Sequence, residues 1–146
     1  ECARASTAPA LRTVEGSEGG PHQVLVIDDE PAVGRAVQRI LKDLEVTVVH
    51  SSDEALVALG AATFDLIISD VMMPETSGPR LWQIVAKTRP ELRDAWIFMS
   101  GGIFDPALTA IVKASGAVLV DKPLCADTLR QTAADHLATR SSLTRA

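Results

Sequence analysis

Short apolar runs rich in β-branched residues alternate along this chain with longer segments of helical period, and no other feature limits its fold as much. The runs have the length of buried strands, and the segments between them are long enough for helices. Strands that alternate with helices in this way form βα units around a parallel sheet. The five predicted strands are Val24–Ile27, Val46–Val49, Leu66–Ser69, Trp96–Met99 and Val118–Val120.

The segments between the predicted strands have the pattern of helices. Pro31 suits the first turn of a helix, and apolar residues follow it at three- and four-residue spacing. A second helix is expected after Ser52, where Asp53 and Glu54 face the positive end of the helix dipole. Three more helices are expected at Gly78–Lys87, Asp105–Ser115 and Ala126–Thr139. The sequence therefore predicts five strands and five helices, with helices on both faces of the sheet.

Length and composition suit a single domain. The chain has 146 residues, of which 47% are hydrophobic, enough for one core of ordinary size. Residues 1–21 are rich in Ala, Ser, Thr, Gly and Pro, the composition of a flexible linker. We therefore expect a linker or tail at 1–21, the folded domain at 22–140 and a C-terminal tail at 141–146. Because the chain starts at Glu1 rather than Met, we expect it to be part of a longer or processed polypeptide.

Charge and hydropathy exclude two classes of partner. The formal net charge is -5, and the 14 Lys and Arg residues are scattered among 19 acidic residues, so no basic stripe for nucleic acid is present. No apolar run approaches the roughly 20 residues that cross a bilayer, and the N-terminus lacks the pattern of a signal peptide. We expect a cytoplasmic location, without nucleic-acid binding or membrane contact by this chain.

Carboxylates follow two of the predicted strands at the point where each strand ends. Asp28 and Asp29 come after the first strand, and Asp70 after the third. The carboxyl ends of parallel strands lie along one edge of a sheet, so these side chains should converge there. Ionised together they repel, unless one keeps a proton with a raised pKa or a cation neutralises them. A small set of hard oxygen ligands favours Mg²⁺ over zinc, which prefers His and Cys.

The fourth and fifth strands bring groups that bind phosphate to the same edge. Ser100 would contribute a hydroxyl, Gly101 a backbone N–H and Lys122 a mobile positive charge. Together with a divalent cation, these groups form a cradle for a phosphoryl group. The sequence thus predicts a site for metal-assisted phosphoryl chemistry at the carboxyl edge of the sheet.

Four motifs, in this order and spacing, resemble those of response-regulator receiver domains. They are VLVIDDE with its acidic pair, SDVMMPETSG around Asp70, MSGG with Ser100, and DKP with Lys122. The resemblance extends from about His22 to Leu137. It implies a flavodoxin-like (βα)5 three-layer sandwich, with a five-stranded parallel sheet in the order 2-1-3-4-5.

The resemblance also implies a reaction and a role for each site residue. The chain would take a phosphoryl group from the phosphohistidine of a histidine kinase or histidine phosphotransfer domain onto Asp70, with Mg²⁺ or Mn²⁺ bound. The metal ligands that it implies are Asp29, Asp70, the backbone carbonyl of Met72 and, through water, Asp28. The groups that would hold the phosphoryl oxygens are Ser100, Lys122 and the Gly101 backbone N–H.

Two features depart from the family's pattern. Leu119 stands where Tyr or Phe is common, so we expect a signalling movement other than an aromatic rotamer change. Thr76 and Ser77 stand where Met and Asp are common, and Pro79 follows Gly78, so the loop before the third helix should have an atypical shape. Neither departure removes a catalytic group.

Three hypotheses about the whole protein remain. The first is the receiver of a hybrid sensor histidine kinase, because MSGG followed by FDPA resembles receivers in that setting. The second is the receiver of a response regulator or a stand-alone adaptor. The third is a Mg²⁺-dependent phosphatase that passes through an aspartyl phosphate, disfavoured because Met72 stands where such enzymes have a second acid. Whether this domain counts as an enzyme stays open, since it would assist only its own phosphorylation and dephosphorylation. Whether it forms a homodimer also stays open.

Overall fold

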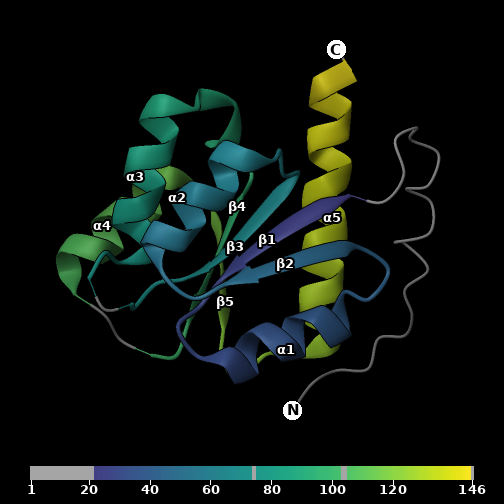
Figure 1. Cartoon of the computed structure of the whole chain (residues 1–146), viewed down its shortest axis with the longest axis horizontal. Helices are drawn as coiled ribbons and strands as arrows, with labels where there is room; N and C mark the ends of the chain where they lie inside the picture. The colour runs from purple at the N-terminus through teal and green to yellow at the C-terminus, as the bar shows by residue number, and fades with distance from the viewer. Residues whose placement is uncertain (1–21, 74, 103–104, 146) are drawn as a thin grey trace.

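The structure of the chain, a computed structural model, describes residues 22–73, 75–102 and 105–145, with side chains described as far as residue 138 (Figure 1). The linker predicted at 1–21 lies outside these residues. The strands pair in parallel in the order β2-β1-β3-β4-β5, which confirms the predicted sheet. They are β1 (Gln23–Ile27), β2 (Glu45–Val49), β3 (Leu66–Asp70), β4 (Trp96–Ser100) and β5 (Val118–Asp121).

Helices cover both faces of the sheet, as expected for parallel strands (Figure 1). The elements are α1 (Pro31–Ile40), α2 (Ser52–Ala61), α3 (Gly78–Thr88), the 3-10 helix η2 (Pro90–Leu92), α4 (Pro106–Ser115) and α5 (Ala126–Arg145). α1 and α5 lie on one face, and α2, α3 and α4 lie on the other. In the part of the chain that the structure describes, no helix is long and apolar enough to cross a bilayer.

The sheet separates two apolar clusters, which together form the core. Every residue of β3 and β4 is buried, because each strand has helices on both faces. Side chains alternate between the faces along a strand, so that Ile67 packs on the side of α2, α3 and α4 while Ile68 packs on the side of α1 and α5. Trp96 and Phe98 are the largest fully buried side chains, and they belong to the cluster on the side of α2, α3 and α4. This packing fixes the strand ends that carry the site.

Candidate functional site

Backbone hydrogen bonds continue beyond the strand ends and hold the site residues in register. The Asp28 N–H donates to the Val49 carbonyl at 3.1 Å, next to β2. The N–H of Lys122, the residue after β5, donates to the carbonyl of Ser100, the last residue of β4, at 2.8 Å. Asp70 is itself the last residue of β3, paired with Met99. The functional side chains therefore project from the rigid edge of the sheet.

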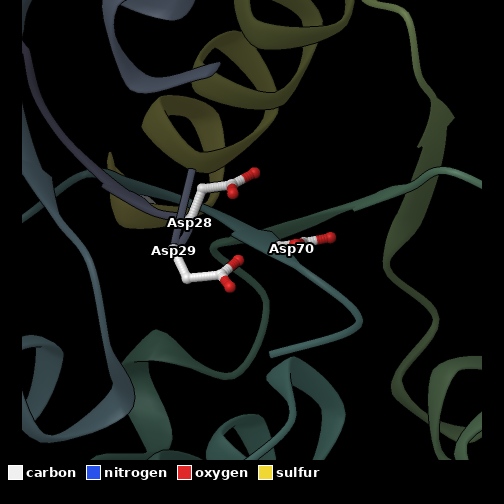
Figure 2. Close-up of side chains that lie close together, drawn as sticks. All are labelled: Asp28, Asp29 and Asp70. Atoms are coloured by element: carbon white, nitrogen blue, oxygen red, sulfur yellow. The ribbon is translucent and has the colours of Figure 1, made fainter. Parts of the chain in front are cut away.

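Three carboxylates converge at this edge, as the sequence predicts. Asp28, Asp29 and Asp70 each offer an oxygen within 4.8 Å of the others. Figure 2 shows the side chains of Asp28 and Asp29, which follow β1, beside that of Asp70 at the end of β3. Asp28 and Asp70 are buried and Asp29 is exposed. Hard anionic oxygens in this number, open to solvent on one side, fit a Mg²⁺-type ion.

One lysine faces these carboxylates. Lys122 Nζ lies 2.9 Å from Asp28 Oδ2, 3.4 Å from Asp70 Oδ1 and 3.9 Å from Glu30 Oε1. Burial alone would lower the pKa of Lys122, but the hydrogen bond to Asp28 and the charge of Asp70 outweigh it and raise the pKa above its ordinary value. Lys122 therefore keeps its positive charge at neutral pH.

Asp70 is held in an unfavourable state as an anion. Burial, and then the nearby charge of Asp28, raise its pKa from 3.8 to about 6, although Lys122 and a hydrogen bond from the Met72 backbone oppose the shift. One ammonium group is thus insufficient to neutralise the cluster. A divalent cation would remove the remaining repulsion, which is an independent physical reason to expect one here.

Ser100 reaches the site edge, but its hydroxyl is engaged locally. The hydroxyl donates to the Gly102 carbonyl at 2.8 Å and accepts the Gly102 N–H at 3.2 Å. A serine has one hydroxyl hydrogen, so donation to a phosphoryl oxygen requires release of that carbonyl. Gly101 is exposed, and a Cβ there would meet nothing within 4 Å, so packing does not require its glycine.

The sequence patterns do not assign Glu30 or Gly78 to the site, but both residues support it. The Glu30 N–H donates to Asp28 Oδ1 at 2.8 Å, which occupies the oxygen that does not face Lys122. The only signal was that Glu30 is the third consecutive carboxylate. At Gly78, a Cβ would lie 2.1 Å from the Asp70 carbonyl oxygen, so a glycine is needed for the first residue of α3 to approach the phosphoacceptor candidate.

The two departures from the family's pattern have definite positions. Leu119 is 41% exposed on β5, opposite Phe98 in the register of β4. Ser77 is the N-cap of α3, and its hydroxyl accepts the Arg80 N–H at 3.4 Å. Met72, beside the site, is 52% exposed. These side chains leave the carboxylate cluster and Lys122 intact.

A sequence model described as the response regulator receiver domain matches residues 24–134. The chain belongs to this family. Receiver domains act in two-component systems, take phosphoryl groups from histidine kinases or phosphotransfer proteins, and generally bind Mg²⁺. The receiver assignment thus agrees with the acidic cluster and lysine at the sheet edge.

Relatives of this receiver domain occur in two kinds of protein. Sensor kinase CckA of Brucella abortus is 36% identical over 56% of this chain and 9% of its own length. Response regulator protein PilR of Pseudomonas aeruginosa is 29% identical over 82% of this chain and 27% of its own. A solved receiver domain of a signal transduction histidine kinase from Syntrophus aciditrophicus matches with a TM-score of 0.68 and 27% identity, covering 81% and 91% of the two chains. This chain therefore spans less than a third of those two curated relatives.

Proposed function

We propose that this receiver domain accepts a phosphoryl group from a phosphohistidine onto the carboxylate of Asp70. The position of Lys122 carries the proposal, because its ammonium lies between Asp28 and Asp70 at the edge of a three-carboxylate cluster. A nucleophilic carboxylate, a cation site and a fixed lysine charge are the parts that phosphoryl transfer requires.

Different ligand roles follow from the surroundings of the three carboxylates. Both oxygens of Asp28 already have partners, the Glu30 N–H and Lys122 Nζ, which favours contact with the ion through water. Asp29 is exposed and is proposed as a direct ligand, together with Asp70 and the Met72 backbone carbonyl. The bound ion, Mg²⁺ or Mn²⁺, would supply charge neutralisation at the phosphoryl oxygens.

The remaining chemistry belongs to residues of the chain. An Asp70 carboxylate oxygen forms the bond to phosphorus while the bond from phosphorus to the imidazole nitrogen breaks, and that nitrogen leaves with the electron pair. The ammonium group of Lys122 is proposed to stabilise the negative charge on the phosphoryl oxygens during the transfer. Ser100 and the Gly101 N–H are proposed as hydrogen-bond donors to the same oxygens. Because the transition state is loose, positioning and charge neutralisation supply most of the acceleration.

A small phosphodonor tests this proposal. With Mg²⁺ and acetyl phosphate, intact-mass spectrometry is expected to show one added phosphoryl group on the wild type and none on Asp70→Asn. The same labelling without divalent ions should be much slower. Equal labelling of the two proteins would show that Asp70 is not the acceptor.

For the parent protein, we propose a hybrid sensor histidine kinase acting in the cytoplasm. The similarity to sensor kinase CckA and to a histidine kinase receiver supports this architecture. The similarity to PilR, which extends over more of this chain, favours the second candidate, a response regulator. The full-length gene decides between them: a kinase core before the receiver supports the first, and an output domain after it the second.

A further inference from the structure

The loop between β3 and α3, described at residues 71–73 and 75–77, is hydrogen-bonded to α2 through the side chain of Ser52. Ser52, the first residue of α2, is 7% exposed, and its hydroxyl donates to the Thr76 carbonyl oxygen at 2.9 Å across 24 residues of sequence. A buried hydroxyl that lost this acceptor would be costly, so the bond persists in the folded state. The phosphoacceptor loop is thereby connected to a helix that contributes no group to the site.

Both ends of this loop are anchored close to Asp70. The Val71 N–H donates to the Met99 carbonyl at 2.8 Å, and the Val71 carbonyl accepts the Gly78 N–H at 3.0 Å. At the start of α3, Gly78 packs so closely on the Asp70 carbonyl that a Cβ has no room. The two ends of the loop therefore lie against Asp70, so a displacement of either end would act on it directly.

The residue next to the Ser52 contact has a strained backbone. Glu75 has a φ of 45°, in the left-handed region that costs a non-glycine residue about 1 kcal/mol or more. Such a conformation persists only where neighbouring contacts hold it, and the bond from Ser52 fixes the carbonyl of the following residue, Thr76. Without that bond, the loop can relax away from this conformation.

Ser52 itself is held in place by the N-terminus of α2. The Ser51 hydroxyl, at the N-cap, accepts the Glu54 N–H at 3.1 Å, and Glu54 Oε1 accepts the N–H of His50, the residue before the N-cap, at 2.8 Å. Ser51 and Ser52 are adjacent, yet the Ser51 hydroxyl accepts from the first turn of α2, whereas the Ser52 hydroxyl donates to the distant loop. The pair provides a matched comparison.

We propose that Ser52 is a positioning residue for phosphoryl transfer: through the Thr76 carbonyl, it holds in place the loop that follows Asp70 and contains the Met72 backbone. This inference rests on the proposed function, since Met72 and Asp70 matter there as ligand and acceptor. Loss of the Ser52 hydroxyl leaves the site residues present but lets their loop move.

The test compares Ser52→Ala with Ser51→Ala. First, hydrogen exchange of the metal-free proteins is measured over residues 71–78, and Ser52→Ala is expected to exchange faster there than Ser51→Ala. Second, Mg²⁺ affinity and the labelling rate with acetyl phosphate are measured per folded molecule. Both should fall about fivefold in Ser52→Ala, equivalent to roughly 1 kcal/mol, and stay at the wild-type value in Ser51→Ala, which loses only helix stability.

Ser52→Cys is the second variant, because it keeps the side-chain volume and gives up the strong donor. Under reducing conditions it is expected to follow Ser52→Ala. The inference is overturned if both Ser52 variants match Ser51→Ala in loop exchange and Mg²⁺ affinity. A wild type that neither binds Mg²⁺ nor is labelled at Asp70 contradicts the proposed function instead, and the metal-free exchange comparison still decides whether Ser52 anchors the loop.

Discussion

At the scale of single residues, the main feature of the site is that one lysine cannot neutralise the negative charge of its carboxylates. Asp28 and Asp70 are both buried, and Lys122 contacts both. The raised pKa of Asp70, about 6, is the physical expression of that imbalance, caused first by burial and then by Asp28. The site stores unfavourable energy that cation binding can release.

This imbalance predicts that Asp70→Asn stabilises the metal-free protein. Because the pKa of Asp70 is about 6 in the folded state and 3.8 ordinarily, the folded protein binds the proton more tightly, and charging Asp70 costs stability as the pH rises through this window. The free energy of unfolding of Asp70→Asn, from chemical denaturation without divalent ions, should exceed that of wild type by roughly 2 kcal/mol near neutral pH. The difference should vanish below about pH 4, where the carboxyl is protonated in both states.

Asp43→Asn is the control for net charge. Asp43 is an exposed carboxylate on the turn after α1, and its replacement should leave stability nearly unchanged. Saturating Mg²⁺ should stabilise the wild type more than Asp70→Asn, because the ion neutralises the charge that asparagine lacks. A wild type that is more stable than Asp70→Asn above pH 6 would contradict this account of Asp70.

The proposed ligand roles predict an order for the two aspartates after β1. Asp29→Ala should weaken Mg²⁺ binding at least about tenfold more than Asp28→Ala, because a direct ligand is lost in one case and a water-mediated contact in the other. Isothermal titration of Mg²⁺ into each variant measures the order, with Asp43→Ala as the charge control. Tighter binding by Asp29→Ala than by Asp28→Ala would reverse the assignment.

Sequence patterns locate the site residues but not all of their partners. Asp28, Asp70 and Lys122 were expected together because each follows or ends a strand of one parallel sheet, a consequence of topology. The contact from Ser52 to Thr76 had no comparable signal, since it depends on the shape of a loop and one side-chain rotamer. The engagement of the Ser100 hydroxyl by its own loop is equally invisible to residue spacing.

At the scale of elements, strands and helices were predictable, and the junction between β3 and α3 was only partly so. Apolar runs and their spacing give the existence of each element. The sequence indicated an atypical loop here, but the left-handed backbone falls on Glu75, a residue type without that preference. Gly78 was assigned to the start of a helix, while its close contact with Asp70 depends on how α3 approaches the sheet.

That contact predicts a different outcome for two glycine substitutions. In Gly78→Ala, the new Cβ would lie 2.1 Å from the Asp70 backbone oxygen, so the backbone must move. In Gly34→Ala, the three atoms nearest the new Cβ all belong to the Val48 side chain, the first at 2.5 Å, and the helical position gains propensity. Gly78→Ala should therefore lose about 1–3 kcal/mol of stability and slow labelling of Asp70, whereas Gly34→Ala should label like wild type.

Denaturation curves and labelling rates per folded molecule measure both effects of the glycine substitutions. The comparison separates a general loss of packing from a displaced acceptor, because both substitutions add one methyl group at a buried position. Normal labelling by a folded Gly78→Ala would mean that Asp70 tolerates movement of α3.

At the scale of the whole molecule, the order of the strands was the part least accessible from the residues themselves. Periodicity predicts each strand but not its neighbours, so the order 2-1-3-4-5 came from the family resemblance and is confirmed by the pairing. Membership of the receiver family and the geometry of the sheet edge agree on one site. The C-terminal limit of the domain depends on different residues, the apolar side chains of α5 that pack in the core.

The core predicts where the domain can be shortened. Leu129, Ala133 and Leu137 of α5 belong to the apolar cluster beneath α1, and among the described side chains Leu137 is the last of them. Although α5 continues to Arg145, we expect the folded domain to end near residue 140. Deleting residues 141–146 should change the free energy of unfolding by less than about 0.5 kcal/mol.

Deleting residues 137–146 instead removes the buried Leu137, which is 2% exposed, and should cost about 2–3 kcal/mol. Chemical denaturation of the two truncated chains and the intact chain measures the difference. Labelling of Asp70 should survive both deletions in the folded molecules, because none of the site residues named above lies on α5. A large loss of stability from the shorter deletion would place the end of the domain beyond residue 140, and equal stability of the two truncations would mean that Leu137 contributes little to the core.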